Sequence, residues 1–173
     1  MLITDGYRAQ QAKLHENPNY GVASVQFAPL VSQLINQFGV RQLLDYGAGK
    51  GRLAQNLKPA HEVKVTLYDP AIPQWSVLPG PHEMVACIDV LEHIEPDCLD
   101  DVLDHLAGLV QRLGFFTVHT GPAIKVLPDG RNAHLTQQPA RWWLPKLLDR
   151  FDLMMFQKTE QGFWVLVAPL GNK

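Results

Sequence analysis

The sequence predicts an α/β fold with a doubly wound, mostly parallel sheet that ends in an antiparallel C-terminal hairpin. Short apolar runs alternate with longer segments whose apolar residues recur at helical spacing, which is the order of a parallel sheet. The last two apolar runs are separated only by a short turn, which predicts the hairpin. We therefore expect the carboxyl ends of the parallel strands to meet at one edge, where such folds bind ligands.

Most elements have a pattern of their own. The segment 25–38 carries apolar residues at helical spacing and is followed by Gly39, which predicts a helix closed by a glycine cap. The segment 97–113 has one apolar face, and Gly114 is expected to cap that helix. The other elements are predicted as a strand up to 45, a helix over 51–57, strands over 63–68, 83–88 and 114–120, a helix over 141–150, and strands over 152–157 and 162–168.

Length and composition fit one domain. The chain has 173 residues, 46% of them hydrophobic and 18% charged, and we expect a single domain over 1–173, with a helical cap or lid over 1–39 and a core over 40–173. The net charge is −2 and the basic residues are scattered, which disfavours a nucleic-acid partner and favours a small-molecule substrate. The sequence does not indicate an oligomeric state.

Cysteine usage and hydropathy predict the compartment. Only Cys87 and Cys98 occur, which disfavours a disulfide framework and suggests reducing surroundings. Neither a signal peptide nor an apolar run long enough to cross a bilayer is apparent. We therefore expect a cytoplasmic protein without a membrane partner.

The most informative motif is Asp45-Tyr46-Gly47-Ala48-Gly49-Lys50-Gly51. Glycines allow a positive φ and a close approach of backbone to ligand, and a carboxylate at a strand end can hold a hydroxyl group, so a nucleoside site is predicted. A dinucleotide fingerprint, G-x-G-x-x-G, would need a glycine at position 52, where Arg52 stands, which disfavours NAD. The segment instead resembles motif I, D/E-x-G-x-G-x-G, of the class I S-adenosylmethionine (AdoMet) methyltransferases.

That resemblance implies the Rossmann-like doubly wound fold of this family, with AdoMet as the cofactor. It implies that Asp45, Gly47, Gly49 and Gly51 bind the cofactor; the alternative is a glycine turn without a ligand. Asp69 follows the strand predicted over 63–68, so it should lie at the same edge of the sheet and accept both ribose hydroxyls. An aspartate before a proline is also an ordinary turn starter.

The connection after this strand is short for the family. Only thirteen residues, 70–82, precede the next clear strand, and four of them are prolines. The third strand and its helix, which the resemblance implies, are therefore expected to be curtailed or missing. The acidic residue that often binds the adenine amine follows that strand in the family, so adenine recognition is unassigned, and Ile72 or Trp75 could offer an apolar face instead.

A second segment, Cys87-Ile88-Asp89-Val90-Leu91-Glu92-His93-Ile94, resembles one in ubiquinone-pathway O-methyltransferases and small-RNA 2′-O-methyltransferases. In those families the acidic residues and the histidine can bind a divalent metal ion together with a histidine downstream. The resemblance implies that Asp89, Glu92 and His93 do so here with His134; a metal-free pocket is the alternative. It makes Asp89, His93 and His134 the candidate catalytic residues, and Asp89 a candidate cofactor ligand as well.

Substrate recognition is expected in the polar segment 121–138, because it follows a strand whose carboxyl end faces the cofactor. It presents Arg131, Asn132 and His134 after a turn. Arg131 could bind an anionic group, and His134 or His119 could act as the base if no metal is used.

Aromatic residues near both ends are further candidates. In this fold class the region ahead of the first strand often folds over the pocket, so Tyr20 is a candidate substrate-binding residue and His15 a second one; a frayed terminus is the alternative. Trp142 and Trp143 point about 100° apart on a helix, so one can enter the core while the other lines the pocket rim.

Three functions follow from these observations. The first is AdoMet-dependent methyl transfer to a small polar acceptor, expected to be a hydroxyl oxygen, by in-line displacement. The second is a catalytically inactive nucleoside-binding subunit with the same fold and a regulatory or partner role. The third, an enzyme acting on nucleic acid, is the weakest, because the chain lacks a basic stripe and the motifs for methylation of exocyclic amines or of cytosine carbon.

Overall fold

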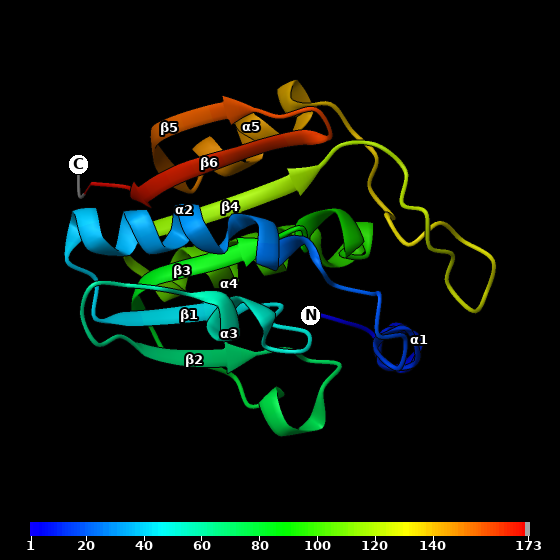
Figure 1. Ribbon diagram of the computed structural model, residues 1–173. Helices are drawn as coiled ribbons and strands as arrows, with labels where there is room; N and C mark the ends of the chain where they lie inside the picture. The colour runs from blue at the N-terminus through cyan, green and yellow to red at the C-terminus, as the bar shows by residue number, and fades with distance from the viewer. Residues whose placement is uncertain (172–173) are drawn as a thin grey trace.

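The computed structural model describes residues 1–171 and contains one six-stranded sheet with helices on both sides (Figure 1). The strands are β1 (Gln42–Tyr46), β2 (Lys64–Tyr68), β3 (His82–Ile88), β4 (Val110–His119), β5 (Phe151–Lys158) and β6 (Gly162–Pro169). Their order in the sheet is β2-β1-β3-β4-β6-β5. The first four run parallel, and β6 is antiparallel to both of its neighbours. The predicted fold class, with its antiparallel C-terminal hairpin, is confirmed.

The helices divide the core into two layers. They are α1 (Asp5–His15), α2 (Ala23–Phe38), α3 (Arg52–Asn56), α4 (Leu99–Leu109) and α5 (Ala140–Leu148), with short 3₁₀ turns η1 (Pro73–Trp75), η2 (Leu91–His93) and η3 (Pro96–Cys98). Side chains of α2 and α3 form one buried cluster with β1, β3 and β4, and those of α4 and α5 form another on the opposite face (Figure 1). No helix within residues 1–171 has both the length and the apolar character needed to cross a membrane.

The carboxyl ends of the parallel strands bring together the segments that matter for function. The strands β1 to β4 all end on the side where α1 and the long loop between β4 and α5 lie (Figure 1). Most of β3 is buried, as a central parallel strand covered on both faces requires. The turns that follow these strands therefore meet at one place.

The boundary between α4 and β4 differs from the prediction. The helix ends at Leu109 rather than at 113, and the strand begins at Val110 rather than at 114. The apolar residues at this boundary fit the spacing of a helix and that of a strand equally well. The pairing of Val110 with His82 of β3 favours the strand. Gly114 is therefore not a helix cap. It lies inside β4, where a Cβ would come within 2.8 Å of Val167 Cγ2 on β6.

Two segments lacked a clear pattern in the sequence. Residues 70–81 contain only the turn η1 and no strand in the described chain, so β2 is an edge strand, in agreement with the curtailed third-strand region. The polar helix α1 is an element that periodicity did not reveal. Its N-cap is Thr4, whose hydroxyl oxygen accepts the N–H of Tyr7 at 3.2 Å.

The two adjacent tryptophans have different surroundings. Trp143 is fully buried and donates its indole N–H to the backbone oxygen of Gln138 at 3.1 Å. Trp142 is half-buried, and the ammonium group of Lys146 lies 5.1 Å from its ring centroid. We expect Trp143→Ala to lower the free energy of unfolding by about 3–5 kcal/mol and Trp142→Ala by about 1 kcal/mol, measured by urea denaturation. Equal losses would contradict this assignment.

Candidate active site

The glycine turn connects β1 to α3. Gly47, Gly49 and Gly51 have φ values of 78°, 52° and 67°, in the left-handed region that disfavours other residues. A Cβ on Gly47 would lie 2.4 Å from Cγ2 of Val90, so this position has no room for a side chain. The glycines therefore let the chain turn tightly at the carboxyl end of β1.

Two carboxylates flank this turn. Asp69 is buried and accepts the N–H groups of Gly49 and Ala71, both at 2.9 Å, so each of its oxygens keeps a free lone pair. Asp45 is also buried, and its Oδ2 has no hydrogen-bond partner. Burial and the nearby charge of Asp69 raise the pKa of Asp45 to about 7. The site thus holds unused acceptors that suit a ligand with hydroxyl donors.

His15, at the end of α1, lies over the same place. Its Nε2 is 3.8 Å from Oδ2 of Asp69, and its Cε1 is 3.2 Å from the position that a Cβ on Gly49 would occupy. Its Nδ1 is buried without a partner, and burial lowers the pKa of the imidazole. The polar head of the chain is thus a helix seated on the turn rather than a frayed terminus.

A hydrogen-bonded chain ties α1 to the turn η2. The hydroxyl of Tyr20 donates to Oε1 of Gln11 at 2.9 Å, and Nε2 of Gln11 donates to the hydroxyl of Tyr7 at 2.6 Å. The hydroxyl of Tyr7 donates in turn to the backbone oxygen of His93 at 2.5 Å. The ring of Tyr20 lies edge-on between those of His15 and His93, with centroid distances of 5.1 Å and 6.0 Å. Tyr20 therefore lies between the glycine turn and a second polar cluster.

That cluster consists of Glu92, His93 and His134, whose potential ligand atoms all lie within 4.8 Å of one another. Nδ1 of His93 bonds to the backbone oxygen of Ala133, and Nδ1 of His134 to that of Gly121, both at 2.7 Å. A carbonyl oxygen only accepts, so both protons are on Nδ1 and both Nε2 atoms carry a lone pair. Metal-binding histidines are usually oriented in this way, by a hydrogen bond from the other ring nitrogen to a carbonyl oxygen.

Glu92 is the carboxyl group of this cluster. Its side chain is fully buried; Oε1 accepts the backbone N–H of His119 at 3.0 Å, and Oε2 has no partner. Burial raises the pKa of Glu92 well above its ordinary value and lowers that of His93 to about 3. Two ligands on one ion can lie about 4.6 Å apart at most, so the cluster needs to contract by only a few tenths of an ångström to bind a cation.

Asp89 lies beside the cluster, outside the group of three. Its φ is 50°, an unusual value for a residue with a side chain, and its Oδ1 accepts the hydroxyl of Thr117 at 2.5 Å. Burial raises the pKa of this carboxyl. Among the metal-binding residues implied by the sequence, Glu92, His93 and His134 come together, and Asp89 instead lines the adjacent cavity.

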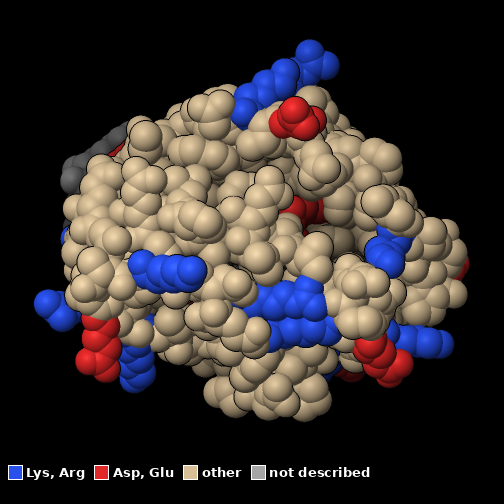
Figure 2. Space-filling model, viewed as in Figure 1, with Lys and Arg blue, Asp and Glu red and all other residues tan. Residues whose placement is uncertain are grey.

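The cavity has a volume of about 440 Å³ and lies between the start of α2, the ends of β3 and β4, and the β5–β6 turn. On this face Figure 2 shows a hollow with an acidic group at its base, and basic side chains only in separate small groups. The lining residues are Val22, Ala23, Gln26, Phe27, Asp89, Thr117, Val118, His119, Thr159, Glu160, Gln161, Gly162 and Phe163. Sequence reasoning missed Gln26, Phe27 and the β5–β6 turn, because no local motif marks them.

The residues predicted to bind substrate in the loop between β4 and α5 differ in their contacts. Arg131 lies on the surface and pairs with Asp129, with 2.7 Å between Nη2 and Oδ2. The side chain of Asn132 accepts the N–H of Ala123 and donates to its carbonyl oxygen, which closes the loop that carries His134. Neither Arg131 nor Asn132 lines the cavity.

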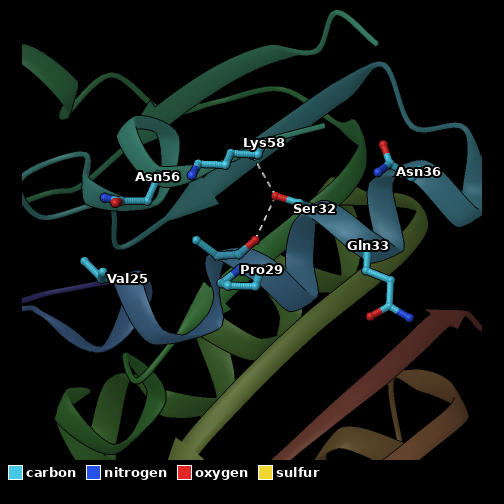
Figure 3. A pocket seen from close by; sticks show the side chains of 8 residues that line it. Val25, Pro29, Ser32, Gln33, Asn36, Asn56 and Lys58 are labelled. Carbon is cyan, nitrogen blue, oxygen red and sulfur yellow. Dashed lines mark hydrogen bonds between the residues drawn. The ribbon is translucent and has the colours of Figure 1, made fainter. Parts of the chain in front are cut away.

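A second groove, of about 480 Å³, lies between α2 and α3 (Figure 3). The hydroxyl of Ser32 there donates to the backbone oxygen of Ala28 at 2.8 Å and accepts the N–H of Lys58 at 2.9 Å. None of the residues that line this groove belongs to the glycine turn or to the histidine cluster. We therefore do not consider it the active site.

Comparisons with known proteins agree with this geometry. A family model described as a methyltransferase domain matches residues 22–157, whereas no curated protein sequence gives a significant match. The 1,6-didemethyltoxoflavin-N1-methyltransferase of Burkholderia thailandensis, solved with its substrate and S-adenosylhomocysteine, is 18% identical with a TM-score of 0.66, over 95% of this chain and 87% of that one.

Two further structures share the fold. The magnesium protoporphyrin IX methyltransferase of Synechocystis PCC 6803, solved with bound SAM, is 17% identical with a TM-score of 0.59, over 94% of this chain and 92% of that one. The small RNA methyltransferase HEN1 is 13% identical with a TM-score of 0.64, over 86% of this chain but only 25% of that one. The family model spans most of this chain, so the protein belongs to the methyltransferase domain family, as a class I S-adenosylmethionine-dependent methyltransferase.

Proposed function

We propose that this protein transfers the methyl group of AdoMet to a hydroxyl oxygen of a small molecule, with a divalent metal ion bound by Glu92, His93 and His134. The main support is the unpaired, fully buried Oε2 of Glu92 next to two imidazoles with free Nε2 atoms. This cluster adjoins the cavity, because His119 lines the cavity and its ring centroid lies 4.7 Å from that of His134.

The cofactor cradle fits a nucleoside. Asp69 has free lone pairs for the ribose hydroxyls, and Oδ2 of Asp45 is an unpaired acceptor. Gly47, Gly49 and Gly51 allow the backbone to turn tightly at the carboxyl end of β1, and Trp75 in η1 would offer the adenine an apolar face. When bound, AdoMet supplies a methyl group on a positively charged sulfur. Asp89, at the end of β3, would lie between this cradle and the cavity.

The residues around the acceptor hydroxyl have separate roles. Glu92, His93 and His134 would hold the metal ion, which when bound lowers the pKa of a coordinated hydroxyl and fixes its direction. Nδ1 of His119 accepts the N–H of Gly121 at 3.2 Å, so Nε2 carries the proton. This Nε2 can donate a hydrogen bond to the substrate oxygen that receives the methyl group. These side chains would position one oxygen for in-line displacement, in which the O–CH3 bond forms as the CH3–S bond breaks and the hydroxyl proton leaves to solvent.

We further propose that residues 1–39 act as a lid on the core. The rings of Tyr20 and His15 cover the glycine turn. Because Nε2 of His15 lies near Asp69, the imidazole must either move or contact the ribose when the cofactor binds. Arg131 and Asn132 would order the loop around His134 rather than bind the substrate directly.

Loss of Asp69 should weaken the cofactor complex. Asp69→Ala removes the acceptor for two ribose hydroxyls, so we expect AdoMet affinity to fall about 5- to 150-fold by calorimetry. Asp69→Asn keeps one acceptor oxygen and should lose less, while Glu62→Ala, an exposed carboxylate before β2, should bind as the wild type does. If the wild-type protein fails to bind AdoMet at millimolar concentration, the proposed function is wrong.

A further inference from the structure

The charge of the cavity restricts what it can bind. None of the described residues that line it is Lys or Arg, while half-buried Asp89 lies at its base and exposed Glu160 at its mouth. We infer that the acceptor is a neutral or cationic molecule with an aromatic body, and that anionic acceptors such as phosphorylated or carboxylated compounds are rejected. This inference rests on the proposed function, because it assumes that the cavity holds the acceptor.

The walls of the cavity indicate the body of the acceptor. Val22 and Phe27 provide accessible apolar surface, and Gln26 and Gln161 provide neutral hydrogen-bonding groups. Val118 and Phe163 also line the cavity but are almost fully buried. The aromatic ring of Phe27 suits a flat ring in the acceptor, and the amides of Gln26 and Gln161 suit neutral substituents. A volume of about 440 Å³ lies within the usual range for small-molecule sites.

A metal ion in the adjacent cluster would not reverse this preference. The carboxylates of Glu92 and Asp89 together balance a divalent charge, which leaves Glu160 as the remaining charge of the cavity. Glu160 takes part in none of the ion pairs formed within residues 1–171. The cavity mouth therefore keeps a negative charge that attracts cations and repels anions.

The one arginine that the sequence suggested for anion binding does not alter this conclusion. Arg131 is held by Asp129 through two hydrogen bonds, at 2.9 Å and 2.7 Å, and it is not among the lining residues. Its charge is compensated on the surface, so an acceptor in the cavity meets carboxylates and amides rather than a guanidinium group.

Three probes that share a vicinal aromatic diol can test the inference: neutral 4-methylcatechol, cationic dopamine and anionic 3,4-dihydroxybenzoate. Their dissociation constants are measured by calorimetry with Mn²⁺ and S-adenosylhomocysteine present. We expect the anionic probe to bind about tenfold more weakly than dopamine, and the difference to shrink at 0.5 M salt because ions screen exposed charges. An anionic probe that binds as tightly as dopamine, or a failure of all three probes to bind, would overturn the inference.

Variants of Glu160 test whether the preference for cationic over anionic acceptors arises in this cavity. Glu160→Gln should weaken dopamine about two- to fivefold without weakening 4-methylcatechol, and Glu160→Lys should favour the anionic probe. Glu62→Gln removes a carboxylate outside the cavity and should leave all three affinities unchanged. An unchanged order of affinities in Glu160→Lys would also overturn the inference. AdoMet binding by the same preparations separates the two claims, because a protein that binds AdoMet but prefers anions contradicts only this inference.

Discussion

Removing both His93 and His134 is expected to weaken metal binding no further than removing either one. Each variant, His93→Ala or His134→Ala, takes one nitrogen ligand from the same group of three, so each alone should lower Mn²⁺ affinity by on the order of a hundredfold. The losses should be non-additive, because the first substitution already destroys the site. Calorimetry with Mn²⁺, Mg²⁺ and Zn²⁺ on the two single variants and the double variant measures this directly.

The control is His61→Ala, a histidine that bonds to the backbone of Val40 at 2.7 Å and lies outside the cluster. It should bind metal ions as the wild type does, and all four variants should keep their affinity for AdoMet. A different result would support the metal-free alternative: if a chelator leaves methyl transfer unchanged while His134→Ala slows it, His134 acts as a base and the proposed metal site is wrong.

Asp45→Asn is expected to make the protein more stable at pH 8 and its stability less dependent on pH. The folded protein holds the proton of Asp45 up to about pH 7, whereas an unfolded chain releases it near pH 4, so folding becomes less favourable as pH rises between these values. An asparagine has no charge to bury. The stability gained at pH 8 could reach about 4 kcal/mol, which denaturant unfolding between pH 4 and pH 8 would reveal.

The same substitution should reduce AdoMet affinity, because an amide offers one acceptor oxygen where the carboxylate offers two. Asp152→Asn, an exposed carboxylate on β5, serves as the control and should retain the wild-type pH dependence. Burial also raises the pKa values of Asp89 and Glu92, which should keep part of the decline. An Asp45→Asn protein whose stability falls from pH 4 to pH 7 as steeply as that of the wild type would therefore contradict the prediction. Stability given up for function is common at binding sites.

The sequence predicted correctly those features whose pattern lies within a few consecutive residues. The glycine turn with Asp45, and the strand β2 that Asp69 follows, are short patterns whose chemistry is visible within seven residues. The structure places both at the carboxyl ends of neighbouring parallel strands. The four prolines after β2 likewise left no room for another strand. The α4–β4 boundary was wrong because apolar residues near 110 fit a helix and a strand equally well, and pairing with β3 decided between them.

Other parts of the site depend on contacts that no local pattern contains. Gln26 and Glu160 lie 134 positions apart in the sequence and meet only because β6 pairs with β4. Arg131 looked suited to binding an anion, but Asp129, two residues earlier, compensates its charge. The polar helix α1 has a weak apolar face, and its position depends on hydrogen bonds to η2 and its neighbours rather than on burial of a stripe.

The contacts of α1 also bear on the timing of the catalytic cycle. Thr4 bonds to Glu95, Tyr7 bonds to His93, and Lys50 of the glycine turn donates to the backbone oxygen of Asn17. The N-terminal segment thus contacts both the glycine turn and the region of η2 that carries His93 and Glu95. Because we propose that the glycine turn binds AdoMet and that residues 1–39 form a lid, we expect turnover at saturating substrate to follow the opening rate of this segment rather than the rate of methyl transfer.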